Sequence, residues 1–581
     1  MQESKMKKKV IEFQNFSFKY ESQKHPTLKN INLTIYEGEK VLIAGPSGSG
    51  KSTLGHCING LIPFSYKGEI TGSLKIMGKE TREAGLFALS KMVGTVLQDP
   101  DGQFIGLTVG EDIAFALEND CVPQAEMLPI VEEAAKLVDM DGHLPASVHH
   151  LSGGQKQRVA LAGVMVDQVG ILLFDEPLAN LDPATGKRAI DLIDQIQKEK
   201  NLTVLIIEHR LEDVLYRPVD RVIVMNEGTI VADMDPDELL AADILERVHL
   251  REPLYIKAAK YAGCTITKEM RPADLSRFRA DTCREPLARW LEEVNVERPV
   301  PGKPPILELE HLSFSYGPDT ETIRDVSFAV HEGEMVSIVG KNGAGKSTVA
   351  KCICGFEKPA SGRILYRGRD ITDETIAERS SKIGMVLQNP NHMISKHLIF
   401  DEVALGLYAR GLPEGEIRDR VEQTLKICGL YPYRHWPISA LSFGQKKRVT
   451  IASILVLQPE ILILDEPTAG QDFRRYTDIM EFLVHLNRQG VTILMITHDM
   501  HLMLEYTDRA IVLADGRKIA ADRCVNILAD EKLMAQANLK ETSLFELAKK
   551  AGLPDPAKLV GRFIAYDREV RGHGQRNAVV Y

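Results

Sequence analysis

The chain has 581 residues, of which 44% are hydrophobic and 26% are charged, and its formal net charge is −10. This balance is typical of a globular protein, and the acidic excess argues against a nucleic-acid binder. The eight cysteines are sparse and irregularly spaced, which argues against a disulfide framework and favours a reducing compartment. Because no signal-peptide pattern and no run of 18 apolar residues occurs, we expect any membrane role to act through a partner.

The sequence contains one domain twice. GPSGSGKST begins at Gly45 and GKNGAGKST at Gly340, 295 residues apart, whereas two later motif pairs are each 290 residues apart. Motifs in one order at near-constant spacing predict a duplication. The five-residue difference places a small insertion in the first copy, around residues 63–72.

Each copy is also followed by a short helical appendix. LREPLYIKAAKYAG from Leu250 aligns with LKETSLFELAKKAG from Leu539, and both read as an amphipathic helix that ends in Gly. We therefore expect domains at residues 8–245 and 305–527, appendices at 246–304 and 528–581, a Pro-rich linker from Val296, and a loose tail from Arg568.

A buried strand is predicted at residues 41–44, followed by a Gly-rich turn and a helix that begins near Lys51. In this context G-x-x-x-x-G-K-[ST] is typical of a phosphate-binding loop, whose backbone N–H groups converge on an anion. The lysine is expected to reach the β- and γ-phosphates and the following serine to bind Mg²⁺. The expected nucleotide-binding residues are Gly45, Ser47, Gly48, Gly50, Lys51, Ser52 and Thr53, and Gly340, Asn342, Gly343, Gly345, Lys346, Ser347 and Thr348.

Two further apolar runs end in paired acids, ILLFDE at Asp175-Glu176 and ILILDE at Asp465-Glu466. Such runs read as buried parallel strands, and ligands bind at the carboxyl ends of such strands. We expect Asp175 and Asp465 to hold the Mg²⁺ shell, and Glu176 and Glu466 to act as general bases toward water. One acid pair alone is explained equally well by stabilisation of a helix N-terminus.

The segments LSGGQKQR from Leu151 and LSFGQKKR from Leu441 complete a motif set that resembles the nucleotide-binding domain of ATP-binding cassette (ABC) proteins. The resemblance implies an α/β fold with two P-loop NTPase domains in one chain. Each domain would have a RecA-like core, an antiparallel β-subdomain, a helical subdomain and a C-terminal helical appendix. It also implies that the two domains face head to tail, with ATP and Mg²⁺ bound between one P-loop and the opposite signature.

The same resemblance assigns the remaining site residues. Ser152, Gly153, Gly154 and Gln155 would complete the Lys346 site, and Ser442, Gly444 and Gln445 the Lys51 site. It further implies Gln98 and Gln388 as sensors of Mg²⁺ and water, Tyr20 and Tyr316 as adenine-stacking aromatics, His209 and His498 as γ-phosphate switches, and Asp182 and Asp472 as links between the sites. From pattern alone, the two tyrosines fit a core position on a β-strand equally well.

The second copy departs from the pattern at Phe443, where the first copy has Gly153. The added bulk would lie in the Lys51 site, so our hypothesis is that the two sites are unequal and that the Lys51 site is slower. A second departure, TAGQD at Thr468 against LANLD at Leu178, carries less weight because both segments end in Asp.

The segments after Gln98 and Gln388 resemble the ATPases of energy-coupling factor (ECF) importers, although Met393 and Ile394 replace Gln103 and Phe104. This implies vitamin or transition-metal uptake at the cytoplasmic face of the membrane, with a membrane scaffold subunit and a substrate-binding membrane protein as partners. No nucleic acid and no homodimer would be required.

Three alternatives stay open. The fused ATPase of a sugar importer would lack the Q-[DN]-P-[DN] pattern. A soluble ribosome-associated tandem cassette would carry a strongly basic linker, whereas Glu246 to Pro305 holds 12 Lys or Arg and 9 Asp or Glu. A DNA-repair ATPase would carry zinc-spaced cysteines, and Cys352 and Cys354 are better explained by core packing.

Overall fold

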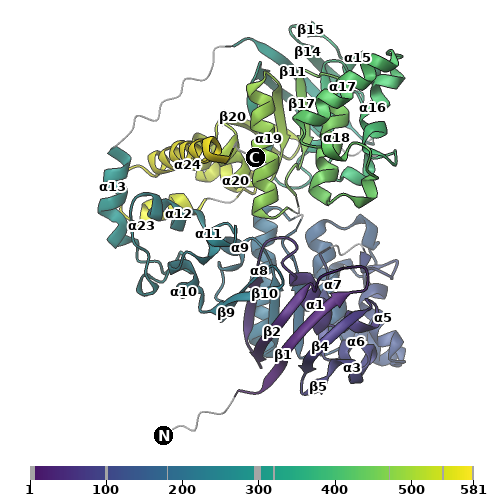
Figure 1. Cartoon of the computed structure of the whole chain (residues 1–581), viewed down its shortest axis with the longest axis vertical. Coiled ribbons are helices and arrows are strands. Elements are labelled where there is room, and N and C mark those ends of the chain that lie inside the picture. The colour runs from purple at the N-terminus through teal and green to yellow at the C-terminus, as the bar shows by residue number, and fades with distance from the viewer. Residues whose placement is uncertain are drawn as a thin grey trace. The chain divides into compact units, whose positions relative to one another are not determined.

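Figure 1 shows the computed structural model, which describes residues 7–98, 102–179, 181–292, 303–317, 321–469, 471–539 and 542–578. The chain divides into two compact units, Met1–Cys283 (unit 1) and Arg284–Tyr581 (unit 2). Most of the linker predicted from Val296 lies outside the described residues. Among the residues described, no helix is both long enough and apolar enough to cross a bilayer.

Unit 1 contains two sheets. The antiparallel sheet has the order β2-β1-β4-β5, and the second sheet has the order β10-β9-β3-β8-β7-β6, parallel except for the β9–β10 pair. The strands are β1 (Lys9–Tyr20), β2 (Leu28–Tyr36), β3 (Lys40–Ala44), β4 (Gly68–Ile76), β5 (Lys79–Glu80), β6 (Val93–Val96), β7 (Ile171–Asp175), β8 (Thr203–Ile207), β9 (Arg221–Asn226) and β10 (Thr229–Met234).

The helices of unit 1 connect and cover these strands. They are α1 (Lys51–Ile58), α2 (Leu61–Phe64), α3 (Thr81–Ala84), α4 (Leu86–Ser90), α5 (Val109–Asn119), α6 (Gln124–Leu137), α7 (Gly153–Met165), α8 (Pro183–Lys200), α9 (Leu211–Val214), α10 (Pro236–Ala241), α11 (Ile244–Arg247) and α12 (Leu254–Tyr261). Helices α5, α6 and α7 pack on one another and form the helical subdomain, while α12 is the predicted amphipathic helix.

Unit 2 repeats the sheets, with orders β12-β11-β14-β15 and β16-β17-β18-β13-β19-β20. Its strands are β11 (Pro305–Ser315), β12 (Glu321–His331), β13 (Met335–Val339), β14 (Ser361–Tyr366), β15 (Arg369–Asp370), β16 (Ile383–Val386), β17 (Ile461–Asp465), β18 (Thr492–Ile496), β19 (Arg509–Ala514) and β20 (Arg517–Arg523). The parallel strands β13, β17 and β18 are mostly apolar and almost fully buried, as is typical of strands in a parallel sheet that is covered on both faces.

The helices of unit 2 follow the same plan. They are α13 (Arg284–Glu292), α14 (Lys346–Cys354), α15 (Ile376–Arg379), α16 (Ile399–Ala409), α17 (Glu414–Ile427), α18 (Phe443–Leu455), α19 (Phe473–Arg488), α20 (Met500–Tyr506), α21 (Cys524–Ala529), α22 (Glu531–Gln536), α23 (Ser543–Lys550) and α24 (Pro556–Ala578). The duplicated α/β fold with two P-loop domains is therefore confirmed. Cys352 and Cys354 are buried in the core of unit 2, as predicted.

The predicted insertion lies between α1 and β4, where unit 1 has the extra helix α2. The loose tail expected from Arg568 is wrong over most of its length, because α24 continues to Ala578. Arg568 anchors this helix by donating to the Glu505 carbonyl at 3.1 Å and pairing with Asp508 at 2.7 Å. The four-part division of the chain stays a prediction.

One helix of the segment 246–304 groups with unit 2 rather than unit 1. Helix α13 packs on α24, where Arg562 donates to the Trp290 carbonyl at 3.1 Å and the Trp290 and Tyr566 rings lie 5.5 Å apart. The end of the first appendix is thus joined to the C-terminal appendix within one compact unit.

Candidate functional site

The predicted phosphate-binding loop of unit 1 connects β3 to α1 in a conformation that requires glycine. A Cβ atom on Gly45 would lie 2.4 Å from the Met225 carbonyl oxygen, and Gly50 has a φ of 100° directly before α1. The Lys51 ammonium folds back and donates to the carbonyls of Gly45 at 2.7 Å and Pro46 at 3.0 Å. The loop therefore presents its backbone and a cation at the N-terminus of α1, the geometry that binds phosphate.

Unit 2 forms the same loop. Lys346 donates to the carbonyls of Gly340 at 2.9 Å and Lys341 at 3.0 Å. The other predicted loop residues line the turn or the first turn of the helix, with Ser47, Gly48, Asn342 and Gly343 exposed and Thr53 and Thr348 buried.

The acids that end β7 and β17 lie beside the serines of the P-loops. The Ser52 hydroxyl hydrogen-bonds Asp175, and Ser347 hydrogen-bonds Asp465. Burial raises the pKa of both aspartates above the usual value, against the opposing effect of these serines. Among the described residues, Asp175 Oδ1 is buried without a hydrogen-bond partner. A hydroxyl and a carboxylate with a free buried oxygen fit Mg²⁺, which prefers oxygen ligands.

The expected general bases follow directly, and both adopt a strained backbone. Glu176 has a φ of 49° and Glu466 a φ of 44°, values that are uncommon for residues other than glycine. Each is held by a backbone bond, from Glu176 N to Ile207 O at 2.8 Å and from Glu466 N to Ile496 O at 2.9 Å. The same left-handed backbone recurs at other equivalent pairs, such as Met77 and Arg367, so it shows that the two units place their glutamates alike.

The surroundings of these two glutamates differ between the units. In unit 1, Gln98 donates to Glu176 at 2.7 Å, and His209 Nδ1 lies 3.9 Å from Glu176 but 3.1 Å from Glu208. Burial, followed by the negative charge of Glu208, raises the pKa of Glu176 to about 7. In unit 2, His498 Nδ1 lies 2.7 Å from Glu466 Oε1.

The difference arises from Glu208, which the sequence analysis missed. It is fully buried and accepts hydrogen bonds from the backbone of His209 at 2.8 Å and Arg210 at 3.2 Å. Its counterpart in unit 2 is Thr497, a neutral residue. The signal was present in the segment IIEHR, where the acid precedes the histidine.

The signature segments begin helices. Ser152 caps α7, with Ser152 Oγ accepting from Gln155 N at 3.4 Å and Gln155 Oε1 accepting from Ser152 N at 2.9 Å. Ser442 and Gln445 form the same capping box on α18. The two glutamine side chains therefore shape the helix N-terminus.

The glycines of the signature do not share one role. Among the described residues, a Cβ on Gly153 would meet a Leu181 methyl at 3.8 Å, whereas one on Gly154 would lie 2.4 Å from Thr185. The first position thus has room for a side chain, and Phe443 occupies it in unit 2 with 39% of its surface exposed. Phe443 consequently adds a ring at the surface of α18 without distorting the helix N-terminus.

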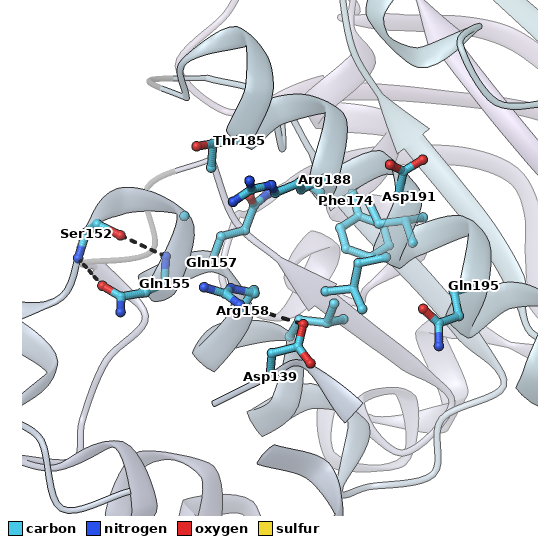
Figure 2. Close-up of a pocket in the computed structure, with 15 residues that line it drawn as sticks. Asp139, Ser152, Gln155, Gln157, Arg158, Phe174, Thr185, Arg188, Asp191 and Gln195 are labelled. Atoms are coloured by element: carbon cyan, nitrogen blue, oxygen red, sulfur yellow. Dashed lines mark hydrogen bonds and ion pairs between the residues drawn. The ribbon is translucent and has the colours of Figure 1, made fainter. Parts of the chain in front are cut away.

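A cavity of about 670 Å³ borders the signature end of α7 in unit 1 (Figure 2). Ser152 and Gln155 lie on one side of it, and Arg158 lies 4.0 Å from Asp139 on another. The signature serine of unit 1 therefore lies at the edge of this cavity.

The remaining predicted residues take different positions. The Tyr20 hydroxyl lies 3.2 Å from Thr53 Oγ1, so this half-buried ring stands over the start of α1. Tyr316 is 55% exposed and follows β11, which excludes a core position for it. Asp182 and Asp472 are buried and cap α8 and α19.

The structure gathers P-loop, acids, glutamine and histidine within unit 1. In unit 2 it likewise gathers the P-loop serine with Asp465, and His498 with Glu466. The expected pairing of Ser152 with the Lys346 site, and of Ser442 with the Lys51 site, joins the two units and stays a prediction.

Comparisons with known proteins agree with this arrangement. A family model described as ABC transporter matches residues 28–179 and 323–469, and one described as ATP-binding cassette cobalt transporter matches residues 242–314. A putative ABC transporter ATP-binding protein of Clostridium perfringens is 59% identical over 565 residues, covering 97% of this chain and 100% of that protein. A protein of the same description from Enterococcus faecalis is 60% identical over 567 residues, covering 97% and 100%.

Solved structures also match parts of the chain. The structure of cbiO1 from Clostridium perfringens, described as part of the ABC transporter complex cbiONQ, is 37% identical with a TM-score of 0.37 and covers 40% of this chain and 94% of that one. On the family match and the full-length relatives, the chain belongs to the ATP-binding proteins of ABC transporters, which are ATPases coupled to transport, and it carries two such domains in tandem.

Proposed function

We propose that the chain is the ATP-hydrolysing motor subunit of an ECF-type importer for a vitamin or a transition metal, with two composite ATP sites formed between its units. The observation that carries this proposal is the duplicated cluster of a P-loop, an aspartate hydrogen-bonded to the P-loop serine, and the glutamate that follows this aspartate. The cobalt-transporter description of the family model that matches the first appendix supports the ECF class.

In each site the residues of this chain have distinct tasks. Lys51 and Lys346 would neutralise phosphate charge, while Ser52, Asp175 and Gln98, and Ser347, Asp465 and Gln388, would hold Mg²⁺. Mg²⁺, when bound, would supply positive charge that offsets the negative charge of the phosphates. Glu176 and Glu466 would take a proton from water, with Gln98 orienting the first of them at 2.7 Å.

The exposed segments after Gln98 and Gln388 are suited to pass motion to a membrane partner. Asp112 of α5 accepts from Ile105 N at 2.9 Å and Gly106 N at 3.1 Å, which fixes the segment on the helical subdomain. Ile105 and Leu107 nevertheless have 63% and 72% of their surface exposed. Exposed apolar side chains on a fixed backbone are typical of a docking surface.

Unit 2 fixes the equivalent segment in the same way, but this segment exposes different side chains. Glu402, at the position of Asp112, accepts from Ser395 N at 2.8 Å and Lys396 N at 2.7 Å. Polar residues thus replace the apolar pair of unit 1, so the two units offer unlike surfaces to the partner. A membrane scaffold with two different contact elements would fit such a pair.

The proposal is tested by isolating the tagged full chain from membranes under mild detergent and identifying what accompanies it. We expect an integral membrane scaffold and a small substrate-binding membrane protein in fixed ratio with the chain. Recovery with ribosomes and without a membrane subunit would overturn the proposal.

A further inference from the structure

A buried lysine ties two functional segments of unit 2 together. Lys447 of α18 is only 1% exposed, and its ammonium donates to the carbonyls of Leu387 at 2.7 Å and Gln388 at 2.9 Å. A buried ammonium is costly unless it is paired and hydrogen-bonded. Its two acceptors are the backbone of the loop that carries the predicted Mg²⁺ and water sensor.

The same ammonium lies in the field of the acids at the end of β17. Burial lowers the pKa of Lys447 to about 8, and the charges of Asp465 and Glu466 act in the opposite direction. The lysine therefore interacts electrostatically with the predicted metal-binding acid and the predicted general base, and it also hydrogen-bonds the loop.

Unit 1 is connected differently at the equivalent position. Gln157 of α7 donates to the Pro177 carbonyl at 2.6 Å, directly after Glu176, and carries no charge. Helix α7 is thus tied to the segment after β7, while α18 is tied to the Gln388 loop. The contrast arises from one substitution between otherwise similar segments, LSGGQKQR and LSFGQKKR.

We propose that Lys447 is a positioning residue that makes the signature helix α18 and the Gln388 loop move as one body. This rests on the proposed function, in which Ser442 at the start of α18 serves the Lys51 site whereas Gln388, Asp465 and Glu466 serve the Lys346 site. One side chain then links elements of both ATP sites. In the described part of unit 1, Gln157 is instead bonded to the Pro177 carbonyl.

The proposal is tested first without nucleotide, by amide hydrogen exchange of the full chain. In Lys447→Gln, amides of residues 387–398 should exchange at least tenfold faster, since charge-assisted hydrogen bonds to the loop are lost. Lys447→Arg should keep exchange close to that of the unaltered chain. Lys446→Gln, which removes a charge from the next position of the same helix, is the matched control and should change nothing there.

A second variant keeps the test decisive if Lys447→Gln fails to fold. Gln157→Lys should place an ammonium within reach of the backbone of Leu97 and Gln98, and should slow exchange in that loop several-fold. Unchanged exchange in these loops in the variants that fold would overturn the proposal. Faster amide exchange spread equally over unit 2 in Lys447→Gln would also overturn the proposal, because this result would mean that Lys447 contributes only to packing.

Steady-state ATP hydrolysis supplies the readout that packing alone would not give. Lys447→Gln should lower kcat several-fold and leave KM for ATP within twofold, because the loop orients the reacting groups rather than the bound nucleotide. A rise in KM with unchanged kcat would contradict the positioning role. If the unaltered chain shows no Mg²⁺-dependent hydrolysis, the proposed function fails while the exchange measurements still decide the role of Lys447.

Discussion

Replacing each expected general base by its amide should affect ATP hydrolysis unequally. The pKa of Glu176 is raised to about 7 by burial and by Glu208, whereas Glu466 pairs with His498 at 2.7 Å. At pH 7 about half of Glu176 is then protonated and unable to accept a proton. Two sites that are otherwise alike would turn over in a ratio of about 1:2.

We therefore expect Glu466→Gln to remove about two thirds of the ATPase activity at pH 7, and Glu176→Gln about one third. Any effect of the Phe443 ring on the Lys51 site would widen this difference. The assay is Mg²⁺-dependent phosphate release by the purified full chain, with nucleotide binding measured for both variants to confirm that their sites are intact. Glutamine keeps the shape of the side chain, so a general loss of folding is not expected.

The pH dependence provides an internal control. Because the folded-state pKa of Glu176 lies above the usual value, its carboxylate form increases as the pH rises through about 7. At pH 8.5 the two losses should approach each other if the pKa is the cause. Equal losses at pH 7 would refute the inequality of the sites.

Three further changes test separate parts of the structure. Gly45→Ala should weaken ATP binding at least tenfold, measured by titration of nucleotide, because the new Cβ would lie 2.4 Å from the Met225 carbonyl. Lys40→Met should lower the free energy of unfolding of unit 1 by about 3 kcal/mol, measured by urea titration at pH 7, because it removes a buried partner of Asp194. Burial acts to raise the pKa of Asp194, but the neighbouring lysines hold this pKa below the usual value. The ion pair therefore stabilises unit 1 above about pH 4, and the difference in unfolding free energy between Lys40→Met and the unaltered chain should shrink as the pH falls further. Leu107→His should reduce recovery of the membrane partner without lowering the ATPase activity of the isolated chain, and unchanged recovery would exclude this residue from the docking surface.

Local patterns in the sequence were sufficient to predict much of the fold. The strand before Gly45, the helix that begins at Lys51 and the strand that ends at Asp175 all lie where short-range rules place them. The duplication strengthened each prediction, because a motif found twice in one order is hard to explain by chance. The insertion was located by the same comparison.

The differences between the two sites were harder to predict because they depend on contacts between distant segments. Glu208 lies beside His209 in the sequence, but its effect on Glu176 follows from their meeting at the ends of β7 and β8. Lys447 reads as one of many surface charges, and only the packing of α18 buries it against Leu387.

The helical structure of the tail could not be predicted for a similar reason. The composition after Arg568 is polar and predicts no amphipathic helix, yet this arginine donates to Glu505 in the last turn of α20 and to Thr507 and Asp508, which follow α20. The local pattern could not show these contacts, because they join Arg568 to a segment that is distant in the sequence.

In the proposed function, ATP hydrolysis by this chain drives import through a membrane partner. Uptake of labelled vitamins and transition metals can be measured in proteoliposomes that contain the chain with its co-isolated membrane subunits. We predict uptake that requires Mg²⁺ and ATP and that is lost in Lys346→Ala, which removes the P-loop cation from the site that we expect to be faster. Uptake that continues unchanged in this variant, or that proceeds without ATP, would contradict a role of this chain as the motor of import.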